Sequence, residues 1–179
     1  TLLQTANTQI AASGLTVPTL TIENYSTVLT ATIAGLSDEK IDAMVKEEAR
    51  TKVETAVRAQ ESVIRPQVEA GVRKAALENA VKTNLGMDLD SYNAAVSAGM
   101  IPEAVQNQIN AGVDAYMASE TGVKTVEAQY EAAVKKAVDE QLETDAVKAQ
   151  ITEGIEKAKA GRESLENLKT QLDSYNEFY

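Results

Sequence analysis

The side chains available for acid–base chemistry in this chain are carboxylates, because the sequence contains neither cysteine nor histidine. That composition excludes thiolate nucleophiles, disulfides, Cys/His metal clusters and a histidine general base. Acids close together in the sequence are Glu47, Glu48, Asp139, Glu140 and Glu143. A catalytic carboxylate pair also needs a cleft, a nucleophile or a metal partner, and no spacing here indicates one. We expect a solvated face, predict no catalytic residue, and single out Glu140 as the acid whose burial must be checked.

A second arrangement, Asp88-Leu89-Asp90, resembles the first residues of a calcium-binding loop. Such a loop needs glycine at its sixth position and glutamate at its twelfth, where this sequence has Asn93 and Gly99. Asp88 is instead expected to cap a short helix with its carboxylate. The sequence therefore predicts no metal site and no cofactor.

The composition favours thin helix-on-helix packing over a thick globular core. Aromatic residues make up 4% of the 179 residues, and the chain has three prolines and nine glycines. The net charge of −10 argues against nucleic-acid binding and against docking on anionic lipid, since both favour clustered lysine and arginine. No run of about 18 apolar residues is present. We expect any membrane attachment to come from segments outside this sequence, which we interpret as a piece of a larger protein.

The elements that would position any site are helices, and the most regular is the last third of the chain. Residues 123–179 contain no proline, and small or apolar residues recur three and four apart in one heptad phase. This periodicity is typical of a coiled-coil seam and predicts one unbroken helix over 123–179. Among the a and d positions of this heptad repeat, which form the seam, the polar exceptions are Glu140 (position d) and Thr144 (position a).

The rest of the chain also reads as helices. We predict them over 1–13 (stopped by Gly14), 22–34 (capped by Thr21), 38–85, 89–98 and 102–118. Pro66 either kinks the helix over 38–85 or breaks it there, and the preferred interpretation is a kinked, continuous helix. The two long helices, 38–85 and 123–179, should run antiparallel.

A second apolar stripe (Val134, Val138 and Leu142) widens the apolar face within 130–147, which predicts a bundle of three or more helices there. Beyond Gly154 the stripe narrows, and the helix over 1–13 is the expected partner, bringing both chain ends to one tip. The predicted fold is therefore all-α: an elongated antiparallel helical hairpin or coiled coil with a small bundle of short helices. We expect a single elongated domain over 1–179, with a stalk part (1–13 with 151–179) and a bundle or distal part (14–150). We interpret it as an excursion from a longer stalk.

The final segment, ITEGIEKAKAGRESLENLKTQLDSYNEFY (151–179), places Gly154 and Gly161 one heptad apart, and Leu165 and Leu168 continue the phase. It resembles the Leu-x-x-Gly heptad repeats of the YhgE/Pip family, the phage infection protein group of Firmicute membrane proteins, which includes relatives associated with type VII secretion. The resemblance implies a helix-rich extracellular region set between an N-terminal membrane helix and a C-terminal membrane domain, in a Gram-positive host. It implies a role as phage receptor or in secretion. The segment departs from the family in having only two glycines in phase before leucine replaces them.

Four residues are candidates for contact. Gly154 and Gly161 are expected to let a facing helix approach closely, because small residues at d positions thin an interface. Tyr92 and Tyr116 are the candidate partner-contact residues, since the short helices should present them away from the stalk. Near the C-terminus, Tyr175 and Tyr179 fall in the seam and are expected in the core, whereas Phe178 lies either at the edge of that core or in solvent.

Two classes of function follow. The first is a non-catalytic extracellular stalk domain that contacts another protein or a second copy of itself. The second is a binding module in which the short helices enclose a pocket for a small apolar ligand or a peptide. A structural coiled-coil protein of a phage or secretion system is a further alternative, and an enzyme is the least supported class.

Overall fold

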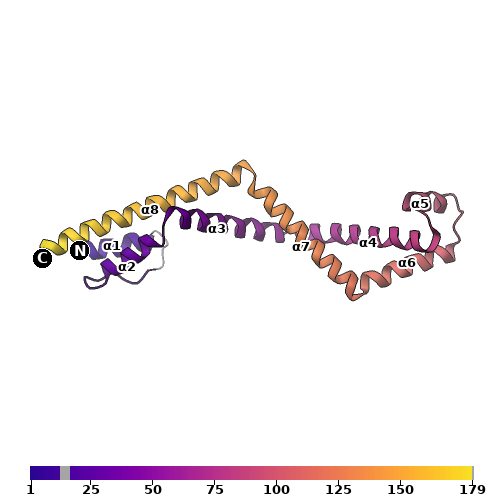
Figure 1. The fold of residues 1–179 in the computed structure, drawn as a ribbon, viewed down its shortest axis with the longest axis horizontal. Helices are drawn as coiled ribbons and strands as arrows, with labels where there is room; N and C mark the ends of the chain where they lie inside the picture. The colour runs from indigo at the N-terminus through magenta and orange to yellow at the C-terminus, as the bar shows by residue number, and fades with distance from the viewer. Residues whose placement is uncertain (13–16, 179) are drawn as a thin grey trace. The chain divides into compact units, whose positions relative to one another are not determined.

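The computed structural model describes residues 1–12 and 17–178. Over these residues the chain is all-α, as predicted, and contains no strand (Figure 1). The helices are α1 (Leu2–Ala12), α2 (Tyr25–Ala34), α3 (Asp38–Arg58), α4 (Glu61–Leu85), α5 (Leu89–Ser97), α6 (Glu103–Ala118), α7 (Glu120–Leu142) and α8 (Asp145–Phe178).

The chain forms two compact units. Thr1–Lys52 and Gln141–Tyr179 make up one, here called the terminal unit, and Val53–Glu140 make up the other, the middle unit. The predicted stalk segments, 1–13 and 151–179, both belong to the terminal unit. That unit also takes in most of α3 and the start of α8, which the sequence analysis assigns to the bundle.

The core of the terminal unit lies where α1 and α2 pack on the C-terminal half of α8. α8 supplies Leu165, Leu168 and Leu172, which occupy successive heptad positions and are all buried. α1 supplies Ala6 and Ile10 to the same cluster. The expected pairing of the first helix with the last segment is confirmed, and it brings Thr1 and the end of α8 to the same end of this unit (Figure 1).

Polar contacts hold the residues just before α2. The Asn7 side chain accepts a hydrogen bond from the Leu20 N–H (2.7 Å) and donates one to the Leu20 carbonyl (3.3 Å). Thr21 and Asn24 cap each other, since the N–H of each donates to the side-chain oxygen of the other. This closed turn makes α2 begin at Tyr25 rather than at the predicted Ile22. The predicted stop at Gly14 lies outside the described residues.

The predicted unbroken helix over 123–179 is wrong, because α7 ends at Leu142 and α8 begins at Asp145. The Thr144 hydroxyl donates to the Gln141 carbonyl (2.6 Å) and accepts from the Val147 N–H (3.4 Å). Threonine side chains compete with the backbone for hydrogen bonds and favour helix starts over helix interiors. Thr144, a polar residue at position a of the predicted seam, thus marks the end of α7 and the start of α8.

The break in the helix predicted over 38–85 lies at residues 59–60, ahead of Pro66. Pro66 is inside α4, where its ring lacks an N–H for the Ser62 carbonyl and crowds that carbonyl. Ending α3 just upstream confines the disturbance to the start of α4. The prediction of one continuous helix kinked at Pro66 is therefore wrong, because the chain forms two helices and the break between them precedes Pro66.

In the middle unit, α4 packs against α5 and α6 around Val81, Tyr92 and Ile109. Asp88 caps α5 as predicted, accepting a hydrogen bond from the Ser91 N–H at 2.7 Å. Gly86 ends α4 with a φ of 65°, a left-handed conformation that glycine adopts without a steric penalty.

The buried residues of α7 recur every four positions instead of in heptads. They are Gly122, Val126, Tyr130, Val134 and Val138. Val123, the predicted seam residue, is 51% exposed. A row of residues four apart winds around a helix and favours an oblique crossing, and α7 crosses the junction of α3 and α4 in Figure 1.

Two arginines fasten α7 at this crossing. Arg58 pairs with Glu131 (2.8 Å) and Arg65 pairs with Glu127 (2.6 Å). The Arg65 guanidinium also lies 4.4 Å from the centre of the Tyr130 ring, a distance suited to a cation–π contact. These contacts join α7 to α3 and α4 inside the middle unit.

Candidate functional site

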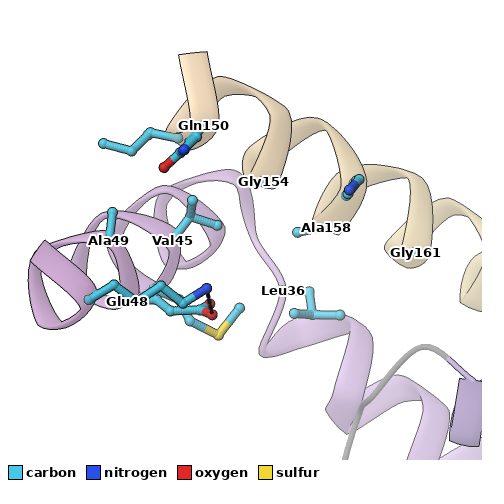
Figure 2. Close-up of a pocket in the computed structure, with 12 residues that line it drawn as sticks. Leu36, Val45, Glu48, Ala49, Gln150, Gly154, Ala158 and Gly161 are labelled. Atoms are coloured by element: carbon cyan, nitrogen blue, oxygen red, sulfur yellow. Dashed lines mark ion pairs between the residues drawn. The ribbon is translucent and has the colours of Figure 1, made fainter. Parts of the chain in front are cut away.

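A groove in the terminal unit runs between α3 and the N-terminal half of α8, with Leu36 at one end (Figure 2). It has a volume of about 520 Å³. Its lining is mostly apolar or small: Leu36, Met44, Val45, Ala49, Ile151, Gly154, Ala158 and Gly161, with Glu48, Lys52, Gln150 and Lys157 as its polar residues. Both glycines singled out from the sequence therefore line one surface.

The two glycines differ in what faces them. A Cβ built on Gly154 would lie 2.9 Å from Val45 Cγ1, so α3 comes close to α8 there. A Cβ on Gly161 would meet nothing within 4 Å. The close approach expected at both glycines is present at Gly154 and absent at Gly161, because Val45 of α3 lies against Gly154 whereas a Cβ on Gly161 would face open space.

Ion pairs within each helix flank the groove. Lys52 pairs with Glu48 (3.1 Å) on α3, and Lys157 pairs with Glu153 (3.0 Å) on α8. These exposed pairs contribute little to stability. Their side chains can therefore exchange partners readily.

Arg162 fixes the α2–α3 turn to α8 at the end of the groove. Its Nη1 donates to the Leu36 carbonyl (3.0 Å) and to Asp38 Oδ1 (2.6 Å). The Arg162 hydrogen bond, helped by its charge, lowers the pKa of Asp38. In the same unit, Lys169 and the Tyr25 hydroxyl lower the pKa of Asp173.

We expect acid to weaken the terminal unit through these two carboxyls. Because their pKa values are lower in the folded chain than in the unfolded chain, the stabilisation is complete above the unfolded pKa and is lost as the pH falls through the folded pKa. In thermal unfolding followed by circular dichroism, the melting temperature should decrease as the pH is lowered from about 5 to about 2. Asp38→Asn should flatten this dependence, and an unchanged slope in that variant would contradict the assignment.

The two candidate tyrosines belong to the middle unit and lie in different surroundings. Tyr92 is 5% exposed and packs in the cluster of Val81 and Ile109, so its ring is not presented to a partner. Tyr116 is partly buried, and its hydroxyl donates to Thr125 Oγ1 at 3.4 Å. Tyr116 lines a hollow of about 390 Å³ between α4, α6 and α7.

Tyr175, near the end of α8, is on the surface, contrary to the expectation of a core, and Phe178 points to solvent, one of its two expected positions. Tyr175 is 46% exposed and Phe178 is 84% exposed. The buried cluster of α1, α2 and α8 follows the a and d positions of α8 as far as Leu172. Tyr175, the next of these positions, lies beyond the cluster. Tyr179 is outside the described residues.

The acidic residues do not assemble into a site. The Glu140 side chain is exposed and lies 4.0 Å from Lys136. Within residues 1–12 and 17–178, no group of three or more acidic, histidine or cysteine side chains is placed to hold a metal ion. None of the helices described is long and apolar enough to cross a membrane.

Sequence reasoning placed Gly154 and Gly161 on the contact face but missed the opposite wall of the groove. Met44, Val45 and Ala49 come from α3. Their apolar spacing marks a buried helix face without naming the helix that it meets. Arg162, which fixes the turn at the groove end, carries no recognisable signal, since it is one charged residue among many on α8.

Comparisons of this chain with protein-family models, with curated proteins and with solved structures find no significant match.

Proposed function

We propose that this chain is a non-catalytic helical domain that works by protein–protein contact, as the distal part of an extracellular stalk. The observation that carries the proposal is the heptad row of α8. Its C-terminal half is buried by α1 and α2, whereas its N-terminal half borders an open groove. A helix face that its own unit covers incompletely is suited to contact another protein.

The placement outside the cell rests on the resemblance of 151–179 to the YhgE/Pip repeats. In that setting the parent protein is anchored in the membrane by other segments, and this domain serves as a phage receptor or in secretion. The acidic chain and its lack of cysteine and histidine are compatible with such a role.

Surface labelling tests this location. Antibodies raised against the purified domain should label intact cells of the organism that encodes it, and protease added to intact cells should remove the signal. A cytoplasmic protein serves as the control for cell integrity. Labelling that requires permeabilised cells would contradict the extracellular assignment.

The alternative, a module that binds a small apolar ligand or a peptide, is favoured by the size of the groove. Ligand sites in proteins typically span about 300–1,000 Å³, and the groove between α3 and α8 falls within that range at about 520 Å³. From the sequence, such a pocket is expected among the short helices. The groove instead uses α3 and α8, whereas the short helix α6 lines the hollow at Tyr116 and a second hollow of about 630 Å³ beside Arg65, Asp114 and Met117.

A further inference from the structure

We propose that α2 is a strap that covers the C-terminal half of α8, and that it opens while α8 stays helical. The opening uncovers the leucine row of α8, which consists of Leu165, Leu168 and Leu172. This inference rests on the proposed function, because it specifies how the buried half of the α8 contact face becomes available to another protein.

α2 is tied to α8 by side-chain hydrogen bonds at both of its ends. At its first residue, the Tyr25 hydroxyl donates to Asp173 Oδ1 at 2.8 Å. Just beyond its last residue, Arg162 Nη1 donates to the Leu36 carbonyl at 3.0 Å and to Asp38 Oδ1 at 2.6 Å. The start of α2 thus lies near residue 173 and its end near residue 162, so α2 runs antiparallel to α8.

The leucine row lies between these two ties. Segments 25–36 and 162–173 have the same number of residues, so helices over them would be equally long, about 16 Å at 1.5 Å per residue. All three leucines fall inside the second segment and are at most 5% exposed. α2 contributes Tyr25 and Leu29 to the cluster that buries them. α2 is therefore a cover of matching length over the row, beside α1.

The sequence of α2 is a poor helix former by itself. Half of its ten residues, YSTVLTATIA, are β-branched, and such side chains lose rotamer freedom in a helix. Its first turn has no acidic residue, its last turn has no basic one, and the Asn24 side chain makes no capping hydrogen bond to it. Isolated helices of fewer than about 12–15 residues are marginal in water. We infer that α2 is helical only while it is docked.

α8 has support of its own. It is 34 residues long, and ion pairs four residues apart join Glu153 to Lys157 and Asp173 to Lys169. Such pairs stabilise a helix without a tertiary partner, and the second pair remains when Tyr25 leaves Asp173. Loss of α2 removes one side of the apolar cluster but none of this local support. Local opening of one element while its neighbour persists is common in proteins.

The docked α2 therefore acts as an autoinhibitory contact. While it is in place, the leucine row is occupied by residues of the same chain. A protein that binds the uncovered row stabilises the open form and shifts the population toward it. Breaking either tie should raise the open population in the same direction without removing any leucine.

Hydrogen exchange followed by mass spectrometry measures this opening. After correction for intrinsic rates, amides of α2 should exchange at least about tenfold faster than those of 162–172 in α8. Tyr25→Phe keeps the buried ring and removes the bond to Asp173. It should speed exchange in α2 by about threefold to tenfold, because a hydrogen bond to a charged group is lost, and leave α8 unchanged. Arg162→Met removes the other tie and should have the same effect.

Each variant has a matched control in the middle unit. Tyr116→Phe removes a tyrosine hydroxyl that donates to Thr125, and Arg73→Met removes an arginine that pairs with Asp114. Neither change should alter exchange in α2. Circular dichroism checks that every variant keeps its helix content.

Labelling of an introduced thiol tests whether the row is uncovered. The chain has no cysteine, so Leu168→Cys places a single thiol in the row, and N-ethylmaleimide reacts with it only when it is accessible. Adding Tyr25→Phe should raise the labelling rate by the same factor as exchange in α2. Val81→Cys, at a fully buried position of the middle unit, should not respond to Tyr25→Phe. If Leu168→Cys does not fold, hydrogen exchange still decides the proposal.

The proposal is overturned if breaking either tie leaves exchange in α2 unchanged, or if α2 and α8 accelerate together, since the terminal unit then opens as a whole. Faster exchange in α2 without faster labelling of a folded Leu168→Cys chain would also overturn it, because the row then stays covered. These measurements use the purified chain and do not depend on its location. Failure of this proposal and failure of the extracellular assignment are therefore distinguishable.

Discussion

Replacing Gly122 with alanine is expected to destabilise the middle unit by about 3 kcal/mol, at the upper end of the usual cost of overpacking. The corner between α6 and α7 closes on this residue. A Cβ built on Gly122 would overlap the Tyr116 carbonyl oxygen and lie 2.9 Å from the Tyr116 carbonyl carbon. These are backbone atoms, so no side chain can rotate away to relieve the contact.

The same corner holds its own hydrogen bonds in place. The Ser119 hydroxyl donates to the Tyr116 carbonyl at 2.5 Å and accepts from the Gly122 N–H at 3.1 Å. A methyl group at Gly122 would push the Tyr116 carbonyl away and break this chain of bonds. Urea unfolding followed by circular dichroism measures the loss.

Gly112→Ala is the matched control, since Gly112 lies in α6 of the same unit and has nothing within 4 Å of its built Cβ. Alanine favours a helix interior over glycine by about 1 kcal/mol, so this variant should be more stable than the natural chain. The two glycine substitutions thus have opposite expected signs. A Gly122→Ala chain as stable as the natural one would show that α6 and α7 do not meet as described.

Leu172→Ala is expected to lower the stability of the terminal unit by about 3 kcal/mol, within the range for leucine in a packed core. Leu172 is fully buried where α1 and α2 pack on α8. Truncation would remove apolar burial and leave a cavity that the neighbouring helices fill only in part. Because natural domains are stable by only about 5–15 kcal/mol, the loss should be plain in a thermal melt.

Phe178→Ala removes a larger side chain from the same helix and serves as the comparison. Phe178 is 84% exposed, so this change should alter stability by no more than about 0.5 kcal/mol. If both variants lost stability equally, the buried row of α8 would not end at Leu172, and Tyr175 and Phe178 would belong to a core.

The sequence predicts one wall of the groove between α3 and α8, but not the distance between its two walls. The heptad phase of α8 identified Gly154 and Gly161 as members of a contact face, because a helical repeat fixes which side chains share a face whatever the surroundings. The distance between that face and a neighbouring helix is not encoded in the repeat. Val45 of α3 therefore lies against Gly154, whereas Gly161 is open. The sequence cannot predict this difference, because both residues are glycines at d positions of the same heptad repeat.

Helix boundaries depended on single polar residues whose effect is local. Asp88 was correctly interpreted as a cap, because its carboxylate needs only the Ser91 N–H three residues on. Thr144 was treated as a tolerated exception in the seam, although its hydroxyl closes one helix and opens the next. A hydroxyl in a helical pattern is compatible with both outcomes, and packing on each side selects between them.

By itself, the sequence determined the all-α class, the position of most helices, the pairing of the first helix with the last segment, and the lack of thiol or imidazole chemistry. These properties follow from composition and from short-range periodicity, which act through neighbours in the chain. Only the tertiary structure decided where the long helices break, that Tyr92 is buried while Phe178 is exposed, and that α3 and α8 leave a groove between them. Those features arise from contacts between residues far apart in sequence, whose distances no local pattern specifies.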